Sequence, residues 1–287
     1  MGDTVAAMTA HPRWLHALIE ANQAREGYDD AAAAALADEA AAMLGSLDFV
    51  IVDDGARGDG VALAVIEPNG RACCLEFAPA PGRAGSLLRS LADAARARGS
   101  DRLWSAGPPR WYLRSGVDAD EADAWAALGA RVTSRHVDLL VDASSCRPVA
   151  GEPSVERVDA AAIEGVARWV GQEFSNDWAT EVRAAGAVGG VFVCRYGSDL
   201  AAFAAHSGHA VARGTFGPLG TARAARGRGL GGRIAAAAIA DLWERGFETA
   251  LVPWVEPSIV SLYGRVARVL DRRDRVLFTL NLAAPTK

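Results

Sequence analysis

Two stretches far apart in the chain share one order of helical and strand-like segments. "GSLLRSLADAARARGSDRLWSAG" begins at residue 85, and "GGRIAAAAIADLWERGFETALVPW" begins at residue 231. Each has helical apolar spacing, a closing Arg-Gly and then a strand-like run, and the elements around each follow in the same order. The chain of 287 residues therefore predicts a tandem repeat of one α/β unit of about 140 residues, an ordinary domain size. The alternative is one α/β domain after an unrelated N-terminal domain.

A polar segment interrupts the regular patterns near the middle of the chain. Between residues 142 and 159, Pro148, Gly151 and Pro153 stand among small and charged residues. Such a cluster is typical of a linker. We therefore expect two domains, 1–145 and 146–287.

Composition narrows the class of protein. With 51% hydrophobic and 23% charged residues, the chain is typical of soluble globular proteins. A net charge of −5 argues against a general nucleic-acid binder, which needs a basic face, and agrees with a small amine as substrate. No apolar run reaches the ~20 residues of a membrane span, and no signal peptide is evident. The cytoplasm is the expected location.

The four cysteines, Cys73, Cys74, Cys146 and Cys194, lack CxxC spacing and histidine partners at metal-ligand spacing. We expect buried reduced thiols and no metal site.

The motif "RGRGLGGR", residues 226–233, contains G-x-G-x-x-G. A dinucleotide fold needs those glycines directly after a strand, and an acidic residue at the end of the next strand. Here the preceding strand is expected to stop at Thr221, five residues ("ARAAR") before the first glycine, and the nearest acid, Glu248, begins the next strand. A P-loop is excluded because no Gly-Lys-Ser/Thr follows.

Two interpretations of the motif remain. The glycines could simply begin a packed helix, although glycine weakens helices and the interleaved arginines repel one another. Alternatively, the N–H groups at the start of the helix bind an anionic phosphate, with the arginines neutralising its charge. The second interpretation explains better why glycines and arginines alternate in this motif.

"RGRGLG", Arg226 to Gly231, fits R/Q-x-x-G-x-G/A and so resembles the pyrophosphate-binding signature of the GCN5-related N-acetyltransferases. The resemblance is strongest over residues 214–270, extends over 155–282, and continues as a degraded copy in 1–142. Tandem proteins of this family include the mycothiol-synthase type of architecture. The resemblance implies two α/β (α+β) domains, each a mixed, mostly antiparallel sheet flanked by helices.

The resemblance also implies a cosubstrate, acetyl-CoA or another acyl-CoA. Its phosphates would meet the loop and helix start, and its pantetheine would run along the preceding strand. The loop residues are Arg226, Gly227, Arg228, Gly229, Leu230, Gly231 and Gly232, and the strand residues are Leu219, Gly220 and Thr221.

In the implied reaction, a neutral amine attacks the thioester directly in a ternary complex. Tyr263 would protonate the leaving thiolate; a half-buried surface tyrosine is the alternative. Glu256 stands where the family often has Asn and would act as a base or bind the amine. Glu173, Glu181 or a water chain could deprotonate the amine instead.

Four residues, Glu173 among them, are expected to bind the substrate. Trp178 is either an aromatic wall or a core residue, Trp254 ends the strand after the motif, and Glu181 is either a substrate contact or an exposed charge near a helix start.

The first half departs from the motif. It has "APGRAGS", residues 80–86, where Pro81 removes an N–H that a phosphate would need, and Trp125 aligns with Tyr263. We expect this half to shape the substrate cleft or brace the fold, and CoA to bind once per chain.

Together these features predict an acyl-CoA-dependent N-acyltransferase, with acetyl-CoA as donor and a small amine as acceptor, working as a monomer or weak homodimer. The alternatives are a non-catalytic acyl-CoA sensor, or the same fold used for O-acyl transfer or decarboxylation.

Overall fold

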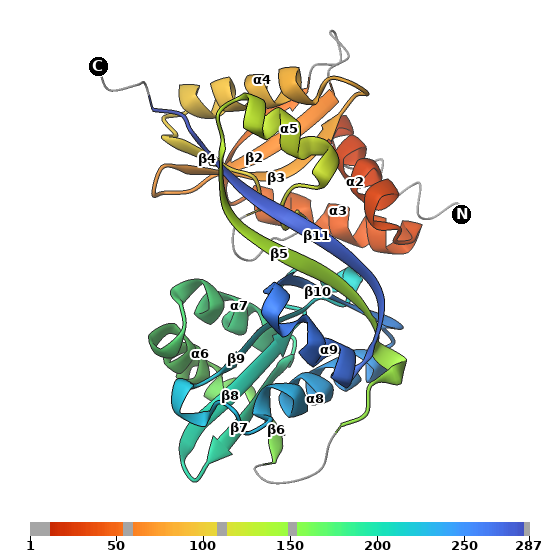
Figure 1. The fold of residues 1–287 in the computed structure, drawn as a ribbon, viewed down its shortest axis with the longest axis vertical. Helices are drawn as coiled ribbons and strands as arrows, with labels where there is room; N and C mark the ends of the chain where they lie inside the picture. Colours follow the sequence, from red (N-terminus) through yellow and green to blue (C-terminus); the bar gives the residue numbers. More distant parts are fainter. Residues whose placement is uncertain (1–11, 54–59, 108–113, 149–153, 284–287) are drawn as a thin grey trace. The chain divides into compact units, whose positions relative to one another are not determined.

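A computed structural model of the chain describes residues 12–53, 60–107, 114–148 and 154–283. It is a mixed α/β structure, as the sequence predicts, and it divides into two compact units (Figure 1). Residues 1–135 together with 274–287 form the first unit, and residues 136–273 form the second.

The first unit combines helices with a mixed sheet. Its elements are α2 (Arg13–Glu26), α3 (Asp30–Leu44), β1 (Asp48–Asp53), β2 (Gly60–Ile66), β3 (Arg71–Pro79), α4 (Ala84–Ala97), β4 (Arg102–Trp104), α5 (Ala119–Ala127), the start of β5 (Arg131–Asp142) and the end of β11 (Arg268–Asn281). Strands β1, β2, β3, β4 and β11 follow one another across the sheet. The β3–β4 pair is parallel and the other pairs are antiparallel.

Helix α4 forms where the apolar spacing predicts it. Leu87, Leu88 and Leu91 are fully buried on one face, as expected for residues three and four apart on a helix. The chain leaves the helix through Gly99, whose φ of 84° is a conformation that glycine adopts at little cost.

The second unit contains a four-stranded sheet and part of a second sheet, in which β5 lies between β10 and β11. Its elements are the end of β5, a 3₁₀ turn (Ala143–Ser145), β6 (Val155–Arg157), α6 (Ile163–Glu173), α7 (Asn176–Ala187), β7 (Val191–Tyr196), β8 (Asp199–His206), β9 (Phe216–Thr221), α8 (Leu230–Glu244), β10 (Thr249–Val255), α9 (Val260–Val266) and the start of β11. Strands β6 to β9 form an antiparallel sheet in chain order, and β10 pairs with β5.

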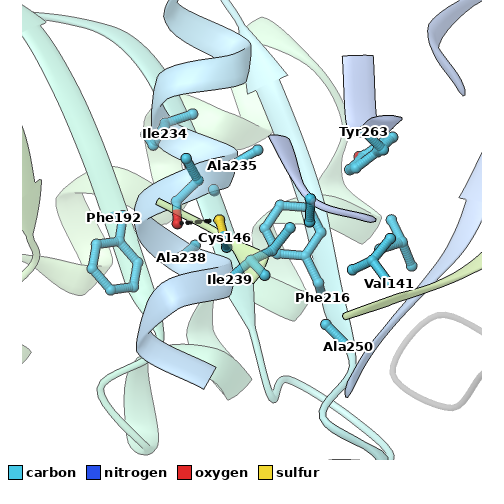
Figure 2. Packing of buried hydrophobic residues seen from close by; sticks show 14 of the residues in the cluster. Val141, Cys146, Phe192, Phe216, Ile234, Ala235, Ala238, Ile239, Ala250 and Tyr263 are labelled. Carbon is cyan, nitrogen blue, oxygen red and sulfur yellow. Dashed lines mark hydrogen bonds between the residues drawn. The ribbon is translucent and has the colours of Figure 1, made fainter. Parts of the chain in front are cut away.

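Helices bury both faces of the four-stranded sheet. Successive side chains of a strand point to opposite faces. Accordingly, Phe192 and Cys194 of β7 pack in the cluster around α8, whereas Val191 and Val193 pack with α6 and α7. Figure 2 shows the first cluster. Because both faces are covered, the inner strands β7 and β8 carry near-continuous apolar runs.

Two strands belong in part to each unit. Residues 137–142 of β5 pair with β10 in the second unit, and residues 279–281 of β11 pair with β4 in the first. The last strand of the sequence therefore completes the sheet of the first unit. The boundary after residue 145 stays a prediction about the sequence repeat. Contacts between residues instead divide the folded chain after residues 135 and 273.

The described part of the expected linker contains the 3₁₀ turn Ala143–Ser145 and one short strand. Strand β6 (Val155–Arg157) lies within residues 142–159 and pairs with β7. A strand of three residues is too short to show an alternating pattern in the sequence. Two of the residues that indicated the linker, Gly151 and Pro153, lie outside the described residues.

Candidate functional site

A pocket of about 830 Å³ opens in the second unit at the start of α8. Its walls are formed by β9 and the loop after it, by the first turns of α8 and by α9. The residue after β10 and the turn between α6 and α7 complete them. The residues lining it are Arg147, Phe174, Trp178, Leu219, Gly220, Thr221, Ala225, Arg226, Gly227, Gly229, Leu230, Gly231, Gly232, Arg233, Ala236, Glu256, Ile259, Leu262, Arg265 and Val266. All the predicted cofactor residues except Arg228 therefore lie in one pocket.

The pocket exists because β9 and β10 separate. In the described chain these strands share only an isolated parallel bridge, between Thr215 and Leu251. On its other edge β9 pairs with β8, and the N–H of Ala222 donates to the carbonyl of Ala201 at 2.9 Å. Backbone groups alternate between the two edges of a strand. Leu219 and Thr221 therefore present their N–H and C=O groups toward the open edge.

The loop between β9 and α8 depends on glycine. Gly227 and Gly229 have φ values of 77° and 76°, in the left-handed region that other residues enter at a cost. No protein atom lies within 4 Å of the position that a Cβ would take at either residue. The turn is thus open on the side where a side chain would stand.

The start of α8 exposes hydrogen-bond donors. Gly229 is the N-cap residue, and no side chain caps the helix. The first backbone N–H that bonds within the helix belongs to Arg233, which donates to the carbonyl of Gly229 at 3.2 Å. The N–H groups of Leu230, Gly231 and Gly232 precede it and have no partner within the helix. They combine with the positive end of the helix dipole to favour an anion.

Neighbouring elements pack closely against the small residues of the site. A Cβ at Gly231 would lie 3.5 Å from Leu262 Cδ1, and one at Gly232 would lie 3.9 Å from Val266 Cγ2. Helix α9 thereby forms the wall beside the first turn of α8.

Arginine dominates the charge of the pocket. Arg226 donates from Nε to the carbonyl of Thr221 at 3.2 Å, whereas Arg228 stacks on the Tyr196 ring at 5.0 Å and does not line the pocket. Glu256, at the end of β10, is the one acid among the described lining residues. An anionic ligand suits this balance of charge.

Sequence reasoning missed several lining residues. Arg147, Arg233 and Arg265 add positive charge, and Phe174 adds an aromatic wall. Arg233 is the last residue of the motif "RGRGLGGR", so its position was a usable signal. Arg147 and Arg265 carry no such signal, because they come from other elements that only folding brings near the loop.

Trp178 lies both at the pocket and in the core, and its contact with a substrate stays a prediction. It lines the pocket and also belongs to an aromatic cluster, with ring centroids 5.4 Å from Phe174 and 6.0 Å from Phe203. Trp169 packs edge-on against both phenylalanines. Trp178 is thus an aromatic wall held in place by the core.

Three other predicted substrate residues do not line the pocket. The Glu173 carboxylate accepts a hydrogen bond from the N–H of Arg223 at 3.1 Å, which attaches α6 to the loop after β9. Trp254, with φ of 62°, stacks on His136 at 4.2 Å. The expectation that Glu181 is exposed was wrong: it is 4% exposed, and its carboxylate lies 3.8 Å from His209 Nδ1. Position 181 falls on the inner face of α7.

Tyr263 lies in the core next to the pocket and not in its lining. It is 4% exposed and packs edge-on against Phe216, with ring centroids 6.0 Å apart (Figure 2). Burial raises the pKa of its hydroxyl above the usual value for tyrosine. The phenol is therefore neutral at physiological pH.

The corresponding connection in the first unit is shorter. Only residues 80–83 connect β3 to α4, whereas residues 222–229 connect β9 to α8. Trp125, which aligns with Tyr263, is fully buried and stacks on Phe278. The turn before α4 is thus shorter than the loop before α8, and its Pro81 has no N–H to donate.

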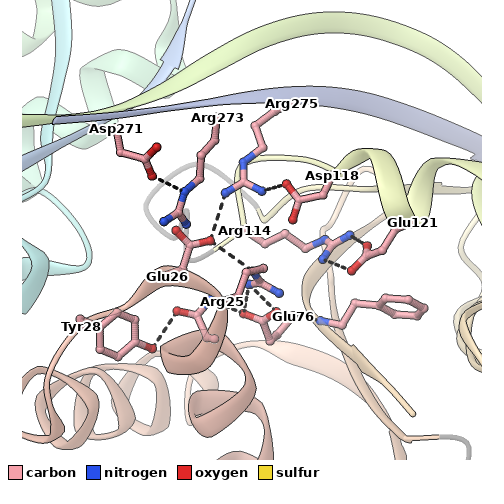
Figure 3. A network of polar contacts seen from close by, with 12 residues as sticks. Arg25, Glu26, Tyr28, Glu76, Arg114, Asp118, Glu121, Asp271, Arg273 and Arg275 are labelled. Atoms are coloured by element: carbon pink, nitrogen blue, oxygen red, sulfur yellow. Dashed lines mark hydrogen bonds and ion pairs between the residues drawn. The ribbon is translucent and has the colours of Figure 1, made fainter. Parts of the chain in front are cut away.

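Charged side chains of the first unit bind one another (Figure 3). The Glu76 carboxylate accepts hydrogen bonds from Asn22 at 2.7 Å and from Arg25 at 2.9 Å. Arg114 pairs with Glu121, and Arg275 pairs with Glu26 and Asp118. These groups satisfy one another without an external ligand.

Two general properties of the described residues bear on function. None of their helices is long and apolar enough to cross a membrane. They also contain no cluster of three or more histidine, cysteine or acidic residues suited to a metal ion.

Comparison with known proteins shows which solved structures share this fold. No protein-family model and no curated protein matches the sequence. Among solved structures, a GCN5-related N-acetyltransferase from Sphaerobacter thermophilus has a TM-score of 0.68 at 14% identity, with 94% of this chain and 92% of that one covered. A tandem GNAT protein from the clavulanic acid biosynthesis pathway has a TM-score of 0.54 at 18% identity, with 84% of each chain covered.

A third structure contains a GCN5-related glucosamine N-acetyltransferase region, within a fungal multi-domain GH3 β-N-acetylglucosaminidase. Its TM-score is 0.63 at 19% identity, and the match covers 85% of this chain but only 34% of that one. At such identities the likeness concerns the fold. The chain has the fold of the GCN5-related N-acetyltransferases, as the motif resemblance implied.

Proposed function

We propose that the protein is an acyl-CoA-dependent N-acyltransferase that transfers the acetyl group of acetyl-CoA to a small amine. The observation that carries this proposal is the start of α8. There, the unbonded N–H groups of Leu230, Gly231 and Gly232 lie in the wall of a pocket whose charge is mainly arginine. The fold shared with known N-acetyltransferases supports it.

The cosubstrate fits the pocket by its chemistry. Its pyrophosphate would accept hydrogen bonds from the first turn of α8, and Arg226 would add a charge-assisted hydrogen bond. Its pantetheine amides would bond to the open edge of β9, at Leu219 and Thr221. An N–H of the same edge would polarise the thioester carbonyl.

The reaction needs no acyl-enzyme. The amine nitrogen attacks the thioester carbonyl carbon, a C–N bond forms, and the C–S bond breaks to release the CoA thiolate. The nitrogen gives up one proton and the sulfur takes one. Glu256, the acid among the described lining residues, would accept the amine proton or bind the amine before it reacts.

Tyr263 would supply the proton for the thiolate. Its raised pKa keeps the hydroxyl protonated, which a general acid requires. Its position outside the pocket lining also supports a second candidate function, a non-catalytic acyl-CoA-binding protein. Such a protein would keep the glycine cradle and have no use for Tyr263.

Calorimetry with acetyl-CoA tests the proposal directly. We expect about one site per chain, because the described pocket lies at the start of α8 and Pro81 removes an N–H from the shorter turn before α4. Pro81→Ala should leave the affinity nearly unchanged. Absence of binding would end the CoA hypothesis. We also propose that the protein works in the cytoplasm, as a monomer or a weak homodimer.

A screen of small amines then separates enzyme from sensor. A thiol reagent would follow the release of free CoA from acetyl-CoA. Amine-dependent release supports the transferase. If acetyl-CoA binds tightly but no amine of a broad panel causes the release of free CoA, the result favours the non-catalytic acyl-CoA-binding protein.

A further inference from the structure

Trp254 departs from the backbone conformation that is ordinary for a strand. Its φ is 62°, in the left-handed region, although it lies in β10 and carries a large side chain. A residue other than glycine enters this region at a cost in free energy, and it stays there only where surrounding contacts hold it. Residues strained in this way cluster at functional sites. Trp254 lies two residues before Glu256, the acid among the described lining residues of the pocket.

Two side chains of β5 hold Trp254. Its backbone N–H donates to Asp138 Oδ1 at 3.1 Å. Its ring stacks on His136, with centroids 4.2 Å apart and planes 7° apart. Both side chains are buried, and because they lie two residues apart on a strand they share one face of it. Neighbouring positions of β5 thus fix both the backbone and the ring of Trp254.

These contacts coincide with a β-bulge in the pairing of β10 with β5. Val252 and Val255 are three residues apart on β10, but their partners on β5 are only two apart. Pro253 and Trp254 therefore stand together against the single residue Asp138. Pro253 has no N–H to give to the ladder, and the N–H of Trp254 bonds to the Asp138 carboxylate.

The bulge decides which side chain of β10 faces the core. Ala250 and Val252 pack in the cluster around α8, as alternate residues of a strand should. Regular alternation would place Trp254 and then Glu256 on that same face. The extra residue puts Val255 there instead, and Glu256 is exposed and lines the pocket. A shift of one residue reverses the face of every side chain that follows.

We propose that Asp138 is a positioning residue for the transfer reaction, which holds Trp254 in the left-handed conformation and so keeps Glu256 directed at the pocket. His136 assists by stacking on the ring. This inference rests on the proposed function, in which Glu256 binds the amine or accepts its proton. It gives a part in the reaction to a carboxylate outside the described lining of the pocket.

Kinetics with an amine that causes CoA release test this role. Asp138→Ala removes the acceptor of the Trp254 N–H, so kcat/KM for the amine should fall about tenfold or more, because a displaced catalytic group loses rate steeply. The affinity for acetyl-CoA, measured by calorimetry, should stay nearly unchanged. Asp138→Asn keeps an oxygen that can accept the same hydrogen bond and should recover most of the loss. A full rate in Asp138→Ala would overturn the assignment.

A double-mutant cycle separates positioning from a general loss of stability. In a Glu256→Gln background, Asp138→Ala should lower kcat/KM little further, since no carboxylate remains to be positioned. The control is Asp142→Ala, which removes another buried carboxylate of β5, the partner of Arg268. Its effect should be the same factor in both backgrounds. If the effects of Asp138→Ala and Glu256→Gln simply multiply, Asp138 does not act through Glu256.

Two variants at residue 254 test the conformation itself, and they do so even where Asp138→Ala fails to fold. Both remove the ring, but glycine adopts a φ of 62° at little cost and alanine does not. Trp254→Gly should therefore keep a kcat/KM for the amine several-fold above that of Trp254→Ala, at equal affinity for acetyl-CoA. Equal values, or a higher value for the alanine variant, would contradict the proposed role of the bulge.

Failure of the proposed function looks different from failure of this inference. In the first case the unmodified protein binds no acetyl-CoA, or no amine causes it to release CoA, and the inference falls with the function. In the second case the unmodified protein is active and the variants at residues 138 and 254 miss their expected rates. A full rate in Glu256→Gln would likewise exclude the role of Asp138 and leave the transferase activity standing.

Discussion

A Cβ atom at Gly220 would lie 2.6 Å from Cε1 of Phe203. Phe174 is almost as close, with Cζ 2.7 Å from the same point. The aromatic cluster between α6, α7 and β9 therefore presses directly on the strand that lines the pocket. Any side chain at position 220 must displace this cluster.

Gly220→Ala should accordingly lower the free energy of unfolding by about 1–3 kcal/mol, the usual cost of overpacking a core. Urea unfolding measures this change. The control is Gly165→Ala in α6, where no atom lies within 4 Å of the Cβ position, so that helix propensity should leave stability equal or slightly higher. Equal stability of the Gly220→Ala variant and the unmodified protein would contradict the described packing.

Gly229→Ala separates backbone strain from cofactor binding. An alanine at φ of 76° should cost about 1–2 kcal/mol of stability, and its Cβ would enter the open side of the loop. We expect the affinity for acetyl-CoA to fall about tenfold or more, since a displaced phosphate loses charged hydrogen bonds. Gly246→Ala, at φ of 93° after α8 and outside the pocket lining, should lose similar stability and keep its affinity. Equal affinities of the two variants would refute the cradle.

Tyr263→Phe tests the proton donor. The substitution keeps the ring against Phe216, so the fold and the affinity for acetyl-CoA should be nearly unchanged. Turnover should fall by about 10²-fold, a typical contribution of general acid catalysis. An unchanged rate of CoA release would remove Tyr263 from the mechanism.

His209 makes stability depend on pH. Burial, with a contribution from Arg213, lowers its pKa to about 3. Between that value and the ordinary pKa near 6.5, the unfolded chain binds a proton that the folded chain does not. The free energy of unfolding therefore falls as the pH drops through this window, by about 1.4 kcal/mol per pH unit from this residue.

His209→Gln should flatten this dependence, although it can lower stability at neutral pH. Urea unfolding between pH 6.5 and 4 compares the two slopes. Parallel slopes would show that His209 takes up its proton without cost in the folded protein.

Glu76→Ala tests the polar network of the first unit. The change leaves the half-buried Arg25 and the buried Asn22 without their shared acceptor. Because Arg25 keeps Glu26 as a partner, we expect a cost of about 3 kcal/mol, the lower end for loss of one member of a buried ion pair. Glu164→Ala removes an exposed partner of Arg183 and should lower stability far less, because water and salt screen an exposed ion pair. Comparable unfolding midpoints for the two variants would contradict the importance of the network.

Local patterns predicted the elements that position the site. The end of β9 at Thr221 and the loop before α8 follow from strand composition, glycine placement and helical spacing, which act over a few residues. Nine of the ten expected cofactor residues line one pocket for the same reason. Arg228 is the tenth, and its stacking on Tyr196 depends on a neighbouring strand.

Sequence alone determined that a mixed α/β chain would carry a glycine cradle at a helix start, because left-handed turns and free N–H groups are local properties of the backbone. Only the tertiary structure decided which distant side chains meet that cradle. It brought Arg147 and Arg265 to the pocket, turned Glu181 inward and buried Tyr263 behind Phe216. Those outcomes depend on the packing of elements far apart in the chain, which no short-range pattern encodes.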